Sequence, residues 1–251
     1  MCSSPTELRR IWGIRSGFRR ADWYKGYRFD PNSDSILTAI NNDEHHRLKT
    51  NLLPGYMGTG QPGQESVVDE HIVHFIELIE RFYLTDVSGR GGVKKMDLGK
   101  VCQFLTQDIT SAVEFGESLG YLEANRDRDG VIAALEGMQV PCAMFALLPE
   151  LLWMVTSRAA KPLMPKPADK QGIGRLVGMI QERVGTRYGD GAKKGVDSLQ
   201  QFVESKLTQK EVEAEALVVS SPPPPPFFFP PTPFYIGWVP RVPLWSSSAH
   251  L

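Results

Sequence analysis

The stretch DEHHRLKTNLLPGY, residues 43–56, contains the signals for one complete helix. The run NND that starts at Asn41 supplies turn and N-cap chemistry, so a helix is expected to begin near Glu44. The Pro-Gly pair at Pro54 is expected to end it, because proline lacks the backbone N–H that a helix needs. The sequence therefore predicts a short helix with a defined start and stop.

The charged residues of this helix allow two interpretations of its surface. His45 and Lys49 are four residues apart and share one helical face, while Leu48 and Leu52 lie on another face that can be buried. A histidine and a cation together suit an anionic group such as a carboxylate or a phosphate. The alternative is a solvated basic face without a ligand, and the residues alone leave both open.

Composition and charge exclude several classes of function. Of the 251 residues, 41% are hydrophobic and 23% are charged, which is typical of globular proteins. The formal net charge of −1 argues against nucleic-acid or membrane-surface binding driven by bulk charge. Residues 16–34 interleave arginine with aromatic residues, but the chain lacks the basic excess that usually accompanies nucleic-acid binding. We therefore predict no nucleic-acid partner and interpret that segment as an ordered loop.

The cysteines and the apolar segments narrow the classes further. Cys2, Cys102 and Cys142 form neither a C-x-x-C pair nor a Cys/His cluster, so we expect no metal site and no disulfide framework. No apolar run reaches the length of a membrane span, and the first residues lack the hydrophobic region of a signal peptide. The chain is therefore expected to be soluble or peripheral.

Apolar residues at helical spacing predict a mainly α fold. Besides a short helix near the N-terminus, the expected helices span residues 66–84, 97–116, 129–152, 172–188 and 207–219. Thr208 and Glu211 form a capping box at the start of the last helix, and Pro141 and Pro149 are expected to kink or break helix 129–152. Together these helices predict one helical domain over residues 1–219.

Three further patterns carry possible chemistry. His71 and His74 are three apart on a predicted helix; they are either metal ligands or structural histidines, and no third ligand accompanies them. The loop VSGRGGVKK lacks the G-x-x-x-x-G-K-[ST] pattern, so a phosphate-binding P-loop is rejected. One apolar set either lines an adaptable pocket or belongs to the core, namely Met138, Met144, Phe145 and Trp153.

The composition changes abruptly at Ser220. Residues 220–251 hold ten of the nineteen prolines, and Arg241 is their one charged side chain of the Asp, Glu, Lys and Arg types. A proline run adopts polyproline II and can be a ligand of the SH3 or profilin type. Because serine, proline and phenylalanine codons are rich in pyrimidines, the same run is also typical of a translated intron. Both interpretations describe an irregular Pro/Phe-rich tail that is separate from the helical domain.

Several stretches in a fixed order resemble a known family. They are RSGFRRADWYKGYRFDP (15–31), DEHHRLKTNLLPGYMG (43–58), FLTQDITSAVEFGESLGYLE (104–123) and LTQKEVEAEAL (207–217). Over residues 5–217 they resemble the pisatin demethylase-like fungal members of the haem-thiolate monooxygenases, the cytochrome P-450 superfamily. The resemblance implies a partial cytochrome P-450 fold, with helices similar to helix B through the start of helix I.

The resemblance also implies a cofactor and a site. Helix 43–56 is similar to the family's helix C, whose histidine or tryptophan and, four residues later, arginine bind the haem propionates. Those positions fall on His45 and Lys49 in this sequence. Lysine keeps the charge of arginine but not its bidentate geometry, so weakened propionate binding is expected. The family further implies an apolar small substrate oxidised with dioxygen, NADPH supplied through a reductase, and anchoring to the endoplasmic-reticulum membrane; the chain contains no segment that resembles the anchor.

The motifs that carry the family's chemistry do not occur in this sequence. They are A-G-x-D-T in helix I, an E-x-x-R pair after it, and F-x-x-G-x-x-x-C-x-G with the iron-binding cysteine. Glu7 with Arg10 and Glu44 with Arg47 spell E-x-x-R, but both pairs are too early in the chain and are interpreted as chance matches. We therefore expect a truncated and inactive monooxygenase without catalytic residues. The alternative is a haem-free helical protein whose Pro-rich tail binds a protein partner.

Overall fold

The computed structural model describes residues 4–13, 16–30, 33–58, 61–84, 94–160, 162, 164–189 and 191–221. Within these ranges the chain is mainly helical and contains no β-strand, as the sequence predicts. The elements are α1 (Pro5–Trp12), the 3-10 helix η1 (Asp22–Tyr27), α2 (Asn42–Tyr56), α3 (Gln64–Tyr83), α4 (Leu98–Phe115), α5 (Tyr121–Ala124), α6 (Val131–Leu147), the 3-10 helix η2 (Pro149–Leu151), α7 (Leu152–Thr156), α8 (Gly172–Gly185), α9 (Ser198–Glu204) and α10 (Gln209–Val219).

Helix α2 begins with the predicted cap and ends later than predicted. The side chain of Asn41 accepts hydrogen bonds from the backbone N–H groups of Asp43 (2.8 Å) and Glu44 (3.2 Å). The expectation that Pro54 ends the helix was wrong, because Pro54 lies inside it. Proline removes only one backbone hydrogen bond of the helix. The N–H of Met57 still bonds the carbonyl of Leu53 at 2.9 Å, so the helix continues to Tyr56.

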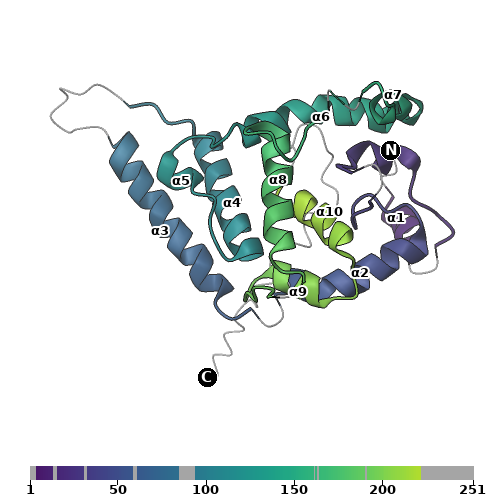
Figure 1. Cartoon of the computed structure of the whole chain (residues 1–251), viewed down its shortest axis with the longest axis horizontal. Coiled ribbons are helices and arrows are strands. Elements are labelled where there is room, and N and C mark those ends of the chain that lie inside the picture. Colours follow the sequence, from purple (N-terminus) through teal and green to yellow (C-terminus); the bar gives the residue numbers. More distant parts are fainter. Residues whose placement is uncertain are drawn as a thin grey trace.

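The main hydrophobic core joins α2 to α8, α9 and α10. Figure 1 shows α8 in the centre, with α10 beside it, α6 at one end and α2 at the other. The fully buried side chains at this junction include Leu48, Leu52, Leu176, Ile180, Leu199, Phe202 and Val212. The two leucines of α2 thus fill the buried face that the sequence predicts for them.

Gly55 explains how closely α2 approaches α9. A Cβ atom at this position would collide with the ring of Phe202, which itself is 1% exposed. The ring of Tyr56 also packs near Phe202, and the centroids of the two rings are 5.4 Å apart. The glycine is therefore required by packing, and the end of α2 is fixed on α9.

A second, smaller core holds α3, α4 and α5 together at one side of the molecule (Figure 1). Its buried side chains are Leu78, Val101, Phe104, Tyr121, Leu122 and Ile132. Asp108 of α4 is 1% exposed and accepts hydrogen bonds from the backbone N–H groups of Tyr121 and Leu122, at 3.0 and 2.8 Å. A carboxylate from one helix thereby caps the start of the next one.

The predicted helix 129–152 is interrupted in the structure. Pro141 lies inside α6 without ending it, whereas the chain leaves the helix at Leu148 and turns by 109° into η2 and α7. Pro149 explains the break, since the residue before a proline is disfavoured in helical geometry. No single described helix is long and apolar enough to cross a membrane. Helix α6 and residues 149–156 have the length and composition of a membrane span only when they are counted together, and they are bent by 109° at the break between them.

Four other boundaries differ from the expectation. The loop predicted over residues 16–34 contains η1, which packs against α6. The turn expected near Tyr121 is the short helix α5, helix α8 ends at Gly185 before the expected Tyr188, and α9 was not predicted. Helix α10 has the predicted capping box between Thr208 and Glu211. Residues 222–251, which hold the Pro-rich tail, and Cys2 lie outside the described residues.

Candidate functional site

Helix α2 carries the two residues that the sequence singles out. His45 is half-buried and Lys49, one turn later, is exposed. In the part of the chain that the structure describes, neither side chain forms an ion pair with a carboxylate. The structure thus places both residues on one face of one helix, as their spacing predicts, and the ammonium group of Lys49 has no carboxylate partner among the described residues.

The imidazole of His45 is in an unusual environment. Its Nε2 atom is buried and has no hydrogen-bond partner. Burial, followed by the positive charges of Arg20, Lys49 and His46, lowers the pKa of His45 to about 4. The ring is therefore neutral at neutral pH. A buried ring nitrogen without a partner is destabilising, so this atom is not a source of stability for the fold.

Arg20 is a part of the site that the sequence analysis missed. Its Nη1 atom donates to the backbone carbonyls of Ile36, Leu37 and Ala39, at 2.9, 3.0 and 3.2 Å. Its guanidinium also lies 4.9 Å from the centre of the Tyr24 ring. Burial lowers the pKa of Arg20, but an arginine stays charged at neutral pH. Two positive charges, a fixed one from Arg20 and an exposed one from Lys49, therefore act on His45.

The position of Arg20 could not be read from spacing along one helix. It precedes His45 by 25 residues, in the segment interpreted as an ordered loop. The one sequence signal was the density of arginine and aromatic residues there, which was assessed only for nucleic-acid binding. A loop that returns to a helix brings such pairs together through tertiary contacts alone.

The opposite side of α2 has a different character. Arg47 donates to Glu44 Oε1 on the same helix at 2.6 Å and also to Glu211 of α10. At the C-terminal end of α2, two turns after Lys49 and on its face, Tyr56 donates its hydroxyl to Glu215, one turn further along α10. The two bonds to α10 fix α2 at both its middle and its end. Glu44–Arg47, one of the two chance E-x-x-R matches, is thus a local ion pair between residues three apart on a helix.

The remaining sequence candidates do not form a site. His71 is buried, and its Nδ1 lies 2.7 Å from the carbonyl of Val67; His74 is exposed, with ring centroids 6.0 Å apart. Within the described ranges no group of three His, Cys, Asp or Glu side chains is placed to hold a metal. Cys102 is exposed, and burial raises the pKa of the Cys142 thiol, which disfavours a thiolate.

The apolar set on α6 and α7 is divided between core and surface. Met138 packs against the main core, but Met144 and Trp153 are 53% and 67% exposed. The two interpretations offered for this set, a lined pocket or a core, both fail for its exposed members. The bend after Leu147 separates Trp153 from the other three residues, which the sequence pattern treated as one helix.

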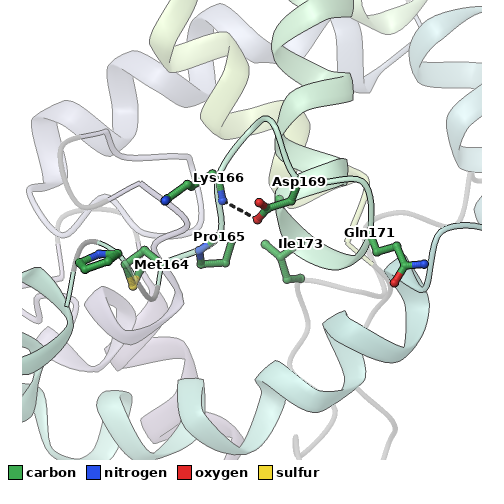
Figure 2. A pocket seen from close by; sticks show the side chains of 8 residues that line it. Met164, Pro165, Lys166, Asp169, Gln171 and Ile173 are labelled. Atoms are coloured by element: carbon green, nitrogen blue, oxygen red, sulfur yellow. Dashed lines mark hydrogen bonds between the residues drawn. The ribbon is translucent and has the colours of Figure 1, made fainter.

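Two surface hollows lie near these elements. Figure 2 shows one of about 350 Å³ beside the start of α8, where the backbone N–H of Lys166 donates to Asp169 Oδ2 at 2.8 Å. A larger one, of about 600 Å³, lies at the start of α2, and its walls carry charges of both signs. Two of these charged pairs are already satisfied internally, Lys25–Asp22 at 3.0 Å and Arg28–Asp34 at 2.6 Å. The linings of the two hollows do not include His45, Lys49 or Arg20.

Comparison with known proteins identifies the family. Over 221 residues, 87% of this chain, the sequence is 29% identical to cytochrome P450 monooxygenase ABA1 of Pyricularia oryzae, of which it covers 43%. It is 31% identical over 214 residues, 85% of the chain, to cytochrome P450 monooxygenase aba1 of Botryotinia fuckeliana, of which it covers 42%. The chain is homologous to the cytochrome P450 monooxygenases of fungi. No family model matches the chain.

The homology confirms the resemblance and agrees with the helical fold. Cytochrome P450 monooxygenase abl1 of Leptosphaeria maculans is 28% identical over 214 residues, 85% of this chain and 37% of that protein. This P450 homologue therefore spans less than half of the length of these relatives. The described helices form the corresponding part of a cytochrome P450 fold.

Proposed function

We propose that this chain provides the propionate-binding side of the haem site of a cytochrome P450 monooxygenase. The observation that carries the proposal is the buried and unpartnered Nε2 of His45 beside two cations. A carboxylate bound there accepts a hydrogen bond from His45 and lies close to the charges of Lys49 and Arg20. Haem fits this environment, since its two propionates supply such carboxylates.

The proposed role of each residue follows from its own chemistry. Lys49 is exposed and flexible, so it attracts the carboxylate as a point charge. His45 is half-buried and donates one directed hydrogen bond. Arg20 is held by three carbonyl groups and acts as a fixed positive charge. When bound, haem supplies the activation of dioxygen for insertion of one oxygen atom into an apolar substrate, with electrons from NADPH through a reductase.

The proposal places the iron ligand outside this set of residues. The motif F-x-x-G-x-x-x-C-x-G does not occur among the 251 residues. Of the two described cysteines, Cys102 lies on α4 and Cys142 on α6, and neither is on α2 with His45 and Lys49. We therefore propose that this chain by itself binds haem through its carboxylates and does not complete the oxidation.

Titration of the full chain with hemin tests this function. We expect His45→Phe combined with Lys49→Ala to weaken hemin binding at least about tenfold, since one charge-assisted hydrogen bond and one ion pair are lost. Lys100→Ala is the control, because Lys100 is an exposed lysine on another helix. Equal affinity in the wild type and the double variant contradicts the site. A thiolate-type carbon monoxide spectrum after reduction contradicts the claim that the iron ligand lies elsewhere.

A further inference from the structure

Two buried carboxyl groups lie where α10 meets its neighbours, and the proposed haem site does not use them. Glu215 of α10 is 0% exposed, and Glu114 of α4 is 1% exposed. Carboxyl groups are almost never fully buried without a partner or a function. The sequence analysis missed both, and for Glu215 the reason is that EVEAEAL has the composition of an ordinary solvent-exposed helix.

Glu215 accepts hydrogen bonds from two different segments. The backbone N–H of Ile36 donates to its Oε2 at 2.8 Å, and the hydroxyl of Tyr56 donates to its Oε1. Ile36 lies before α2, and Tyr56 is the last residue of α2. One carboxyl group of α10 therefore connects to both ends of the segment that contains the candidate site.

Glu114 contacts the C-terminal end of α10. The hydroxyl of Ser220, the C-cap residue of α10, donates to Glu114 Oε2 at 2.8 Å. Glu114 Oε1 is buried and has no hydrogen-bond partner, and the same holds for Nη1 of Arg183 on α8. The C-terminal half of α10 is thus held through two carboxyl groups that are shielded from water.

The charged and titratable groups around this pair are the following. Tyr56 faces both carboxyl groups from α2, Arg183 faces Glu114 from α8, and Asp197 faces Glu114 from the N-cap position of α9. Arg183 also bonds Glu117 at 2.6 Å, and Asp197 bonds Arg187 at 2.6 Å. Both cations therefore have carboxylates of their own, and neither bonds directly to Glu114 or Glu215.

Burial raises the pKa of both carboxyl groups. Burial raises the pKa of Glu215 to about 7, although the hydrogen bonds from Tyr56 and Ile36 oppose the rise. Burial, and then the charge of Glu215 and of Asp197, raise the pKa of Glu114 well above its usual range, against the effects of Ser220 and Arg183. Both carboxyl groups are therefore harder to deprotonate in the folded chain, and the charge of an ionised Glu215 raises the pKa of Glu114 further.

We propose that Glu215 and Glu114 form a proton-dependent latch, in which deprotonation of Glu215 near neutral pH loosens the docking of α10 onto α2 and the segment before it. This proposal does not depend on haem binding. Its sign follows from linkage: a carboxyl group that holds its proton more tightly when docked than when free stabilises the docked state most at low pH. The extra stability that this proton gives the docked state is lost as pH rises from about 4.5 to about 7.

Hydrogen exchange of the Ile36 amide measures the latch directly, because this N–H donates to Glu215. In the full chain, and relative to the intrinsic exchange rate at each pH, we expect its protection to fall roughly a hundredfold between about pH 5 and about pH 8. Carboxyl NMR of the same sample should show Glu215 titrating near pH 7. Titration of Glu215 near the pH of a free glutamate overturns the proposal, as does protection of Ile36 that is independent of pH.

Variants distinguish the latch from a purely structural contact. Glu215→Gln removes the titrating group and keeps one acceptor oxygen in place of the two that now accept from Ile36 and Tyr56, so we expect protection of Ile36 that is independent of pH. Tyr56→Phe removes a donor that favours the charged form and should move the transition to higher pH. Glu213→Gln on the same helix is the control and should behave like the wild type. A pH-dependent loss of protection that persists in Glu215→Gln assigns the effect to another group and overturns the proposal.

Discussion

The two sides of helix α2 differ in whether their polar groups have partners. On one side, Arg47 bonds Glu44 and Glu211. On the other, the buried Nε2 of His45 has no partner, and no described carboxylate pairs with Lys49. Both sides have similar composition, so residue type alone does not separate them.

We interpret the difference as a division between a side that holds structure and a side that is proposed to hold a ligand. A polar group with a partner contributes modestly to stability, and its removal leaves the partner unsatisfied. A polar group without a partner contributes nothing to the fold, and a ligand can supply what it lacks. On this comparison, changes on the anchored side should alter stability, and changes on the open side should alter binding. The predictions below test that division, starting from the largest effect.

The largest effect is expected at Gly55, where the anchored side meets α9. Gly55→Ala places a Cβ against the ring of Phe202, and such overpacking costs about 1–3 kcal/mol of the free energy of unfolding. Urea unfolding of the full chain measures this loss in the free energy of unfolding. Gly137→Ala on α6 is the matched control, because nothing lies within 4 Å of its added Cβ. There the helix propensity of alanine should raise stability by about 0.5–1 kcal/mol.

An intermediate effect is expected at Arg47. Arg47→Ala removes the bonds to Glu44 and Glu211, and because these pairs are partly solvated the loss should be about 1 kcal/mol. Lys49→Ala, two residues later on the same helix, should change stability by less than about 0.5 kcal/mol. Thermal or urea unfolding of both variants measures the two changes in stability. A larger loss for Lys49→Ala than for Arg47→Ala would reverse the assignment of the two sides.

The smallest effect is the pH dependence of stability that His45 contributes. Its lowered pKa means that the unfolded chain binds a proton between about pH 6.5 and about pH 4 that the folded chain does not. Stability from this group is therefore lost as pH falls through that window. Since His45 is half-buried and screened by solvent, the change should be below about 1 kcal/mol.

His45→Phe isolates this contribution, because the raised pKa of Glu215 gives the opposite slope in part of the same window. We expect the difference in melting temperature between wild type and His45→Phe to become less favourable to the wild type on acidification. At neutral pH the variant should be as stable as the wild type or slightly more stable, since an unpartnered buried nitrogen is removed. An unchanged difference between about pH 7 and about pH 5 would show that His45 has an ordinary pKa.

Local signals in the sequence predicted the parts of the fold that local interactions determine. The predicted capping box of Thr208 and Glu211 is present, because it joins residues three apart. The face shared by His45 and Lys49 follows from helical spacing alone. These features needed no knowledge of the neighbouring segments.

The parts that the sequence did not predict depend on tertiary contacts. Helix α9 has seven residues and is held by the contact of Phe202 with Gly55, which are far apart in the chain. Arg20 reaches His45 through a loop, and Glu215 is buried although Glu213, two residues earlier in a similar sequence, bonds Gln209 near the surface. Burial of a charged residue is decided by what packs on it, which spacing cannot reveal.

The most direct test of the two-sided account compares hemin with hemin dimethyl ester, in which both propionates are neutral. In the wild type, hemin should bind the full chain at least about tenfold more tightly than its ester. This preference should disappear in the His45→Phe, Lys49→Ala double variant, persist in Arg47→Ala, and increase in Lys49→Arg because arginine can bind a carboxylate through two hydrogen bonds. Equal affinity of the wild type for hemin and for its ester would contradict the assignment of this side of α2 to an anionic ligand.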